Sequence, residues 1–171
     1  GVTAAKTLAM AWNKPLIAVN HVHAHLQSAM LETENIELPA VALVVSGGHT
    51  NLYCCKDAID LELIGSTIDD AAGEAFDKVS SILALGYPGG PRIEKAAKTG
   101  NCRAVAFPRS MLDRDDFQFS FSGLKTAVLY HCRGQDMKGE NRVRNMTNQQ
   151  IADIAASFQA AVLDILAGKS I

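Results

Sequence analysis

Several signals that would assign a chain to a special class are missing from this sequence of 171 residues. Its four cysteines form no Cys-x-x-Cys pair, so the usual spacing of a zinc site is absent. No apolar run reaches the roughly 18 residues that a membrane span requires, since the strongest, VALVVSGG, ends after a few. A signal peptide, with a charged segment ahead of an apolar one, is also missing. We therefore expect no membrane association and reduced thiols in the cytoplasm.

The charge is nearly balanced along the chain. Lys and Arg number 16 against 18 Asp and Glu, for a net charge of -2, with no block of one sign. This excludes a purely electrostatic binder of nucleic acid or membrane. Hydrophobic residues make up 48% and charged residues 20%, which is typical of folded globular proteins and excludes disorder. The chain starts at Gly1 within a helical pattern and stops without a clear closing element, so we expect a segment of a longer protein.

Helical and strand patterns are mixed along the chain, which predicts an α/β fold. The helices are predicted over residues 2–12, 21–32, 69–85, 92–98, 124–131 and 151–166, the last after a capping box formed by Thr147 and Gln150. The strands are predicted over residues 16–19, 41–45, 51–55, 61–64 and 117–121. Residues 41–55 have the pattern of a hairpin around a glycine turn, and residues 87–91 that of a loop.

Three histidines stand close together at the start of the second predicted helix. At 100° per residue, His21 and His25 lie about 40° apart, whereas His23 falls on the other side. Two histidines at this spacing suit a single transition metal, although solvent-facing histidines are the plainer alternative. Val22 occupies the position where a His-Glu-x-x-His peptidase carries its catalytic glutamate, which argues against proteolysis.

The turn over residues 46–50, Ser-Gly-Gly-His-Thr, could bring backbone N–H groups close to an anion. No Gly-Lys-Ser/Thr follows at Walker spacing, so phosphate binding and a simple hairpin turn remain equal alternatives. In the next predicted helix Asp70, Glu74, Asp77 and Ser81 share one face. That face is either solvated or bears a carboxylate for ribose hydroxyls, with Gly89 and Gly90 of the following loop closing over the nucleoside.

Two further segments could meet an anionic ligand. Ser122 lies between a predicted strand and a predicted helix, where an ordinary N-cap is the plainer interpretation, and Lys125 follows in the first helical turn. The basic residues between positions 133 and 144 could contact RNA phosphates, although a solvated loop is the simpler alternative. The basic residues there are Arg133, Lys138, Arg142 and Arg144.

Five blocks of the sequence, taken in order, resemble the TsaD family of tRNA adenosine threonylcarbamoyltransferases. They are NHVHAH, VALVVSGGHTNL, IDDAAGEAFDKV, YPGGP and FSFSGLKTA. The resemblance implies an actin-like (ASKHA, RNase H-like) two-lobed fold. Residues 1–38 would end the N-terminal lobe with the metal-binding helix, and residues 39–171 would start the C-terminal lobe with its helical insertion.

The resemblance also implies an activity and the residues that serve it. Such enzymes transfer threonylcarbamoyl from threonylcarbamoyl-adenylate to N6 of the adenosine 3′ of the anticodon in tRNA. A divalent metal, iron rather than zinc, would polarise the carbonyl group. TsaB-type and TsaE-type subunits would be partners in the cytoplasm. The metal ligands would be His21 and His25, and the substrate would meet Val44, Val45, Ser46, Gly47, Gly48, Asp77 and Gly90.

This sequence departs from the family pattern in two ways. His23 stands where many members carry an acid, and the family's phosphate-binding hairpin and final metal-binding aspartate are missing. We therefore expect the 171 residues alone to be inactive. A non-catalytic scaffold paralogue and an ASKHA-type small-molecule kinase are the alternatives; the pair His21 and His25 argues against the paralogue, and SGGHT fits the kinase less well.

Overall fold

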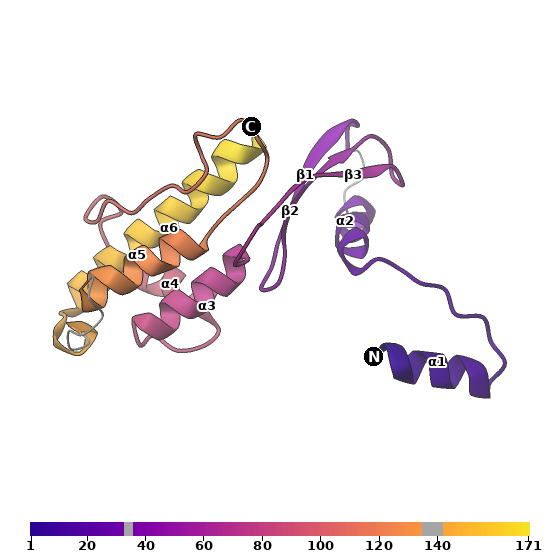
Figure 1. Ribbon diagram of the computed structural model, residues 1–171, viewed down its shortest axis with the longest axis horizontal. Coiled ribbons are helices and arrows are strands. Elements are labelled where there is room, and N and C mark those ends of the chain that lie inside the picture. Colours follow the sequence, from indigo (N-terminus) through magenta and orange to yellow (C-terminus); the bar gives the residue numbers. More distant parts are fainter. Residues whose placement is uncertain (33–35, 135–141) are drawn as a thin grey trace. The chain divides into compact units, whose positions relative to one another are not determined.

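The computed structural model describes residues 1–32, 36–134 and 142–171 (Figure 1). The chain divides into two compact units, Gly1–Ile36 and Glu37–Ile171, and each is described by itself. The mixture of helices and strands confirms the predicted α/β class.

The first unit consists of two helices, α1 (Val2–Ala11) and α2 (His21–Glu32), both at the predicted positions. The strand predicted over residues 16–19 is wrong, because this segment pairs with no strand in the part of the chain that the structure describes. Its side chains are exposed, with Ile17 at 81%. An isolated apolar run of this length has no partner for its backbone groups, so its β propensity alone does not make it a strand.

The second unit begins with a three-stranded antiparallel sheet in the order β1-β2-β3. Its strands are β1 (Ala40–Val45), β2 (Thr50–Cys55) and β3 (Leu61–Ser66). Val45 faces Thr50 across the first hairpin, which confirms the predicted glycine turn between these positions. The third predicted strand is confirmed as well, and its register with β2 shifts after Leu52.

Helices make up the rest of the second unit. They are α3 (Ala72–Ile82), α4 (Gly89–Ala97), α5 (Ser122–Arg133), the 3₁₀ helix η1 (Arg142–Asn145) and α6 (Asn148–Ser170). The predicted start of α3 at Asp69 was wrong by three residues, because the carboxylates of Asp69 and Asp70 serve α5 instead. The predicted start of α4 was also three residues late, because Pro91 is tolerated in a first helical turn, where N–H groups have no helical partner.

The core of this unit lies between α3, α5 and α6. Phe121, Val79 and Phe158 are fully buried there. The strand predicted over residues 117–121 was wrong, since it is reduced to one isolated bridge between Thr67 and Phe119. β3 ends at Ser66, so residues 117–121 lie beyond the end of the strand and cannot form a longer ladder with it.

The long helix α6 begins with the predicted capping box. The Thr147 hydroxyl accepts the N–H of Gln150 at 3.2 Å, and the Gln150 amide oxygen accepts the N–H of Thr147 at 2.8 Å. The prediction that no segment is long and apolar enough for a membrane span is wrong for α6, which passes that test by length and composition. Half of the most apolar stretch of α6 is buried within the protein, as in a core helix.

Candidate functional site

The side chains of His21 and His25 face each other on α2. Their Nε2 atoms are 3.3 Å apart, with one donating to the other according to the tautomer. The Asn20 carboxamide oxygen caps the helix by accepting the N–H groups of Val22 at 2.9 Å and His23 at 3.2 Å. Both imidazoles are exposed, and their helical spacing makes the pair a local feature of this one helix.

This separation fits a shared metal ion. Two imidazole nitrogens at about 2.0–2.1 Å from one tetrahedral ion stand about 3.3–3.4 Å apart. The ring nitrogens are therefore already at the separation that two ligands of one ion require. Among the described residues, no group of three or more His, Cys, Asp and Glu side chains could hold a metal. A metal site at this pair would therefore need further ligands from outside the described residues.

The turn between β1 and β2 is held together by Ser46. Its N–H donates to the carbonyl of His49 at 2.8 Å, and its hydroxyl accepts the N–H groups of Gly48 at 3.3 Å and His49 at 3.1 Å. Gly47 and Gly48 are exposed, and a Cβ atom on either would meet nothing within 4 Å. Packing within the described structure therefore does not require these two glycines, so their open side is accessible to a ligand.

The hairpin is fastened to the start of α3. The Thr50 hydroxyl, fully buried, accepts the N–H of Ala72 at 2.8 Å, and the Ser46 carbonyl accepts the N–H of Gly73 at 3.2 Å. A Cβ atom on Gly73 would lie 2.5 Å from the Ser46 oxygen. The sequence blocks SGGHT and DDAAGEAFDK, which are separate along the chain, thus meet at one contact that only glycine permits.

Asp77 connects α3 with α4. One of its carboxylate oxygens, Oδ1, accepts the N–H of Gly89 at 2.7 Å, at the first position of α4. Gly89 is buried against the backbone of Phe76 and Asp77, where no side chain fits. Gly90 is different, since a Cβ there would meet nothing within 4 Å. The predicted substrate carboxylate therefore has one oxygen committed to the fold.

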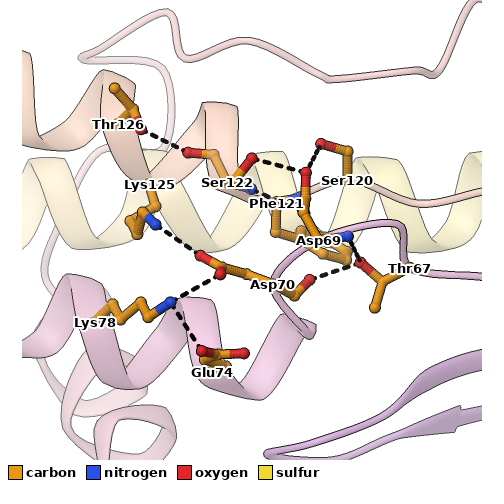
Figure 2. A network of polar contacts seen from close by, with 10 residues as sticks. All are labelled: Thr67, Asp69, Asp70, Glu74, Lys78, Ser120, Phe121, Ser122, Lys125 and Thr126. Atoms are coloured by element: carbon orange, nitrogen blue, oxygen red, sulfur yellow. Dashed lines mark hydrogen bonds and ion pairs between the residues drawn. The ribbon is translucent and has the colours of Figure 1, made fainter.

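Asp69 and Asp70, between β3 and α3, form the centre of a polar network with α5 (Figure 2). Asp69 accepts the hydroxyls of Ser120 at 2.6 Å and Ser122 at 2.7 Å, and also the N–H groups of Phe121 and Ser122. The carboxylate of Asp69 thus caps α5 from a distant part of the chain. The predicted N-cap at Ser122 was wrong, because Phe121 is the N-cap and the Ser122 hydroxyl donates.

Asp70 holds two lysines at once. Lys78 Nζ lies 2.8 Å from one of its oxygens and Lys125 Nζ 2.9 Å from the other, and Lys78 also contacts Glu74. Burial raises the pKa of Asp70, but the hydrogen bonds from Lys78 and Lys125 outweigh it and leave the pKa below its usual value. The sequence singled out Lys125 for an anionic ligand, whereas the structure pairs it within the protein (Figure 2). Nothing in the sequence around Asp70 or Lys125 predicted that these two residues pair.

Comparison with known proteins decides the family. A model of the TsaD family, described as tRNA N6-adenosine threonylcarbamoyltransferase, matches residues 1–171. The chain belongs to the TsaD family. This confirms the resemblance carried by the five sequence blocks.

Curated relatives agree with this assignment to the TsaD family. Proteins from Rhodopirellula baltica, Syntrophomonas wolfei and Moorella thermoacetica are 54%, 50% and 50% identical, over 99%, 100% and 100% of this chain. Each is named tRNA N6-adenosine threonylcarbamoyltransferase. The chain covers 48% of each, so it spans about half the length of these relatives. None of the names favours the kinase or the scaffold paralogue.

The structure brings together only part of the site expected from the TsaD resemblance. His21 and His25 form a pair in the first unit, while the other predicted residues lie in the second. Val44 and Val45 end β1, next to the turn that carries Ser46, Gly47 and Gly48. Asp77 reaches the start of α4 beside Gly90. Their contacts with a substrate or metal stay predictions. Of the predicted basic segment 133–144, residues 135–141, including Lys138, lie outside the described residues.

We expect Gly73→Ala to destabilise the second unit by about 1–3 kcal/mol, because the added methyl group overlaps the Ser46 carbonyl. Gly48→Ala is the matched control, since its methyl group points into open space. Denaturant unfolding of both purified variants measures the effect. Equal free energies of unfolding for the two variants would show that the contact between the hairpin and α3 is not tight.

We expect Asp70→Asn to lower the free energy of unfolding by about 1–2 kcal/mol at pH 7, because two charged hydrogen bonds are lost. The folded pKa of Asp70 is lowered, so its contribution is complete above the unfolded value of about 3.9 and disappears as the pH falls through the folded value. In urea titrations, the difference in free energy of unfolding between wild type and Asp70→Asn should therefore shrink as the pH falls from about 5 to about 2.

Glu94→Gln serves as the control for this experiment. Its exposed pair with Lys98, at 3.8 Å, should contribute less than about 1 kcal/mol. A deficit of Asp70→Asn that stays constant down to the lowest pH would contradict the assigned role of the carboxylate charge.

Proposed function

We propose that the full-length protein transfers a threonylcarbamoyl group from threonylcarbamoyl-adenylate to N6 of the adenosine 3′ of the anticodon in tRNA. The observation that carries this proposal is the family match over all 171 residues, together with relatives named for this activity. The N6 amine would attack the carbonyl carbon and form a C–N bond. The C–O bond to the phosphate would break, AMP would leave with the electron pair, and N6 would release one proton.

His21 and His25 would hold a divalent metal ion, iron rather than zinc, and this ion would supply a Lewis acid for the carbonyl group of the donor. The support is the 3.3 Å separation of the two Nε2 atoms. The Asn20 cap fixes the first turn of α2, so the two rings are held at a spacing set by the helix. Neutral imidazoles bind metals through their lone pairs, so binding would replace the hydrogen bond between them.

The turn over residues 46–48 would receive the adenylate. Exposed glycines let a phosphate or sugar approach the backbone closely, and nothing in the described structure fills the space next to Gly47 or Gly48. Val44 and Val45 would contact the same ligand from the end of β1. Asp77 would offer its Oδ2, the oxygen not used by Gly89, to a ribose hydroxyl, with Gly90 alongside.

Several broader features complete the proposal. The fold of the full-length protein would be actin-like and two-lobed, with residues 1–38 in the N-terminal lobe and residues 39–171 in the C-terminal lobe. TsaB-type and TsaE-type subunits would assist the enzyme in the cytoplasm. The 171 residues alone would be inactive, since they supply two metal ligands and span half the length of the relatives.

The transferase proposal is tested in cells depleted of their own enzyme of this family. We expect the full-length protein to restore threonylcarbamoyladenosine in total tRNA, quantified by mass spectrometry. His21→Ala/His25→Ala should reduce the restored level at least tenfold, because both ligands of the metal are removed. His23→Ala is the matched control on the same helix and should restore the modification.

Two outcomes of this complementation would count against the proposal. If wild-type protein is expressed with compatible partner subunits and does not restore the modification, the proposed activity is wrong. If the double variant restores as much as wild type, the activity stands but the metal assignment is wrong.

The adenylate assignment is tested separately by binding. We expect Gly48→Val to weaken the binding of a non-hydrolysable adenylate analogue at least tenfold, because its side chain would enter the space left for the ligand. Thermal unfolding should be unchanged, since that space is open in the protein. Ala58→Val, in the exposed turn between β2 and β3, is the control; calorimetry that finds equal affinity for both variants would refute the assignment.

A further inference from the structure

Four cations without a carboxylate partner gather at one end of the helical part of the second unit. Six other lysines and arginines of this unit form ion pairs within the protein, namely Lys56, Lys78, Lys98, Arg109, Lys125 and Lys169. Arg92 and Lys95 on α4, and Arg142 and Arg144 on η1, form no ion pair within the described ranges. All four are exposed, and we call them the basic end.

The first hollow of the basic end lies between α4 and the start of α6. It measures about 320 Å³. Arg92 and Lys95, one turn apart, line one wall, and Asn148 lines the other. The hollow thus combines two cations with a neutral amide.

The second hollow lies between the end of α5, η1 and α6. It measures about 600 Å³. Arg142 and His131 line it together with Tyr130, and Asn145 and Gln150 add amide groups. Tyr130 is 41% exposed, so an aromatic ring is accessible in the hollow that Arg142 lines.

The two hollows flank the first turn of α6, which Figure 1 shows running alongside α5. Asn148 and Ile151 face the first hollow, and Gln150 faces the second. An α-helix with its side chains is about 10–12 Å wide, a distance over which a nucleic-acid backbone presents several phosphates. One strand could therefore meet both hollows.

Among the described residues, the basic end has fewer carboxylates than cations. The first turn of α6 contains no acid, and Glu94 is paired with Lys98. Asp153 accepts only neutral donors, the N–H of Asn101 and the side-chain amide of Gln149, both at 2.8 Å, so it keeps its charge and offsets one of the four cations. The described residues of this surface therefore carry a net positive charge, although the whole chain carries a net charge of -2.

We propose that the basic end binds the phosphate backbone of structured RNA, namely the tRNA substrate; this inference rests on the proposed function. Arginines and amides are the side chains that bind phosphate and sugar oxygens, including the ribose 2′-hydroxyl. A docking site for a protein would require an apolar centre. Among the described residues that line the two hollows, Tyr130 is the one exposed large hydrophobic residue, so the surface fits RNA better.

The test measures binding of purified substrate tRNA to the full-length protein by fluorescence anisotropy at several salt concentrations. We expect Arg92→Ala/Lys95→Ala and Arg142→Ala/Arg144→Ala each to weaken binding about tenfold. The slope of log affinity against log salt should fall by about 1.5 for each pair, since up to two phosphate contacts are lost. Circular dichroism melting verifies that the variants are folded.

Lys56→Ala/Arg114→Ala is the control, because it removes the same charge from exposed sites at the β2–β3 turn and near the end of α6. Its affinity should stay close to wild type. If the basic-end variants bind like this control while wild type still modifies tRNA, the inference is overturned and the proposed function stands. Wild-type protein that neither binds nor modifies tRNA would overturn both.

A third outcome separates RNA from a protein partner. If the basic-end variants keep their affinity for tRNA but lose activity when partner subunits are present, the surface binds an acidic protein. That result would also overturn the inference.

Discussion

The start of α3 is held by the β1–β2 hairpin, and the arrangement of the second unit depends on this contact. Ala71, the N-cap residue, provides no side-chain cap, so the first N–H groups of the helix need acceptors from elsewhere. The buried Thr50 hydroxyl and the Ser46 carbonyl supply them. Because Gly73 has no side chain, the turn lies directly on the helix. Any ligand that reaches the turn therefore meets a backbone whose position is fixed by α3.

The same helix is tied to α5 by charge. Asp69 accepts two N–H groups at the start of α5, and Asp70 is shared between Lys78 of α3 and Lys125 of α5 (Figure 2). A carboxylate that is only 14% exposed would be costly to bury alone, and two lysines offset that cost. The blocks DDAAGEAFDK and FSFSGLKTA thus stabilise each other, and at Asp70 and Lys125 they leave little charge for a substrate.

Structural and functional demands overlap in the residues of the candidate site. Asp77 holds the start of α4 with one oxygen, and Gly89 is required by its contact with α3. Gly47, Gly48 and Gly90 have no such structural reason, since a Cβ atom on each would meet nothing within 4 Å. Glycines that packing does not require are the ones that we assign to the ligand, whereas buried glycines such as Gly73 belong to the fold.

The sequence by itself determined the local features. Helical spacing placed His21 and His25 together, the capping box set the start of α6, and the glycine turn gave the first hairpin, because each depends on residues a few positions apart. Only the tertiary structure decided which apolar segments outside the three-stranded sheet stay unpaired, and how distant charges pair. Residues 16–19 have strand propensity but no partner, and β3 ends before residues 117–121 can pair with it. Lys125 and Asp70 are 55 residues apart, so no periodicity reveals that they neutralise each other. Hydrogen bonds between distant segments form only when the chain folds, and this is why the local pattern could not predict them.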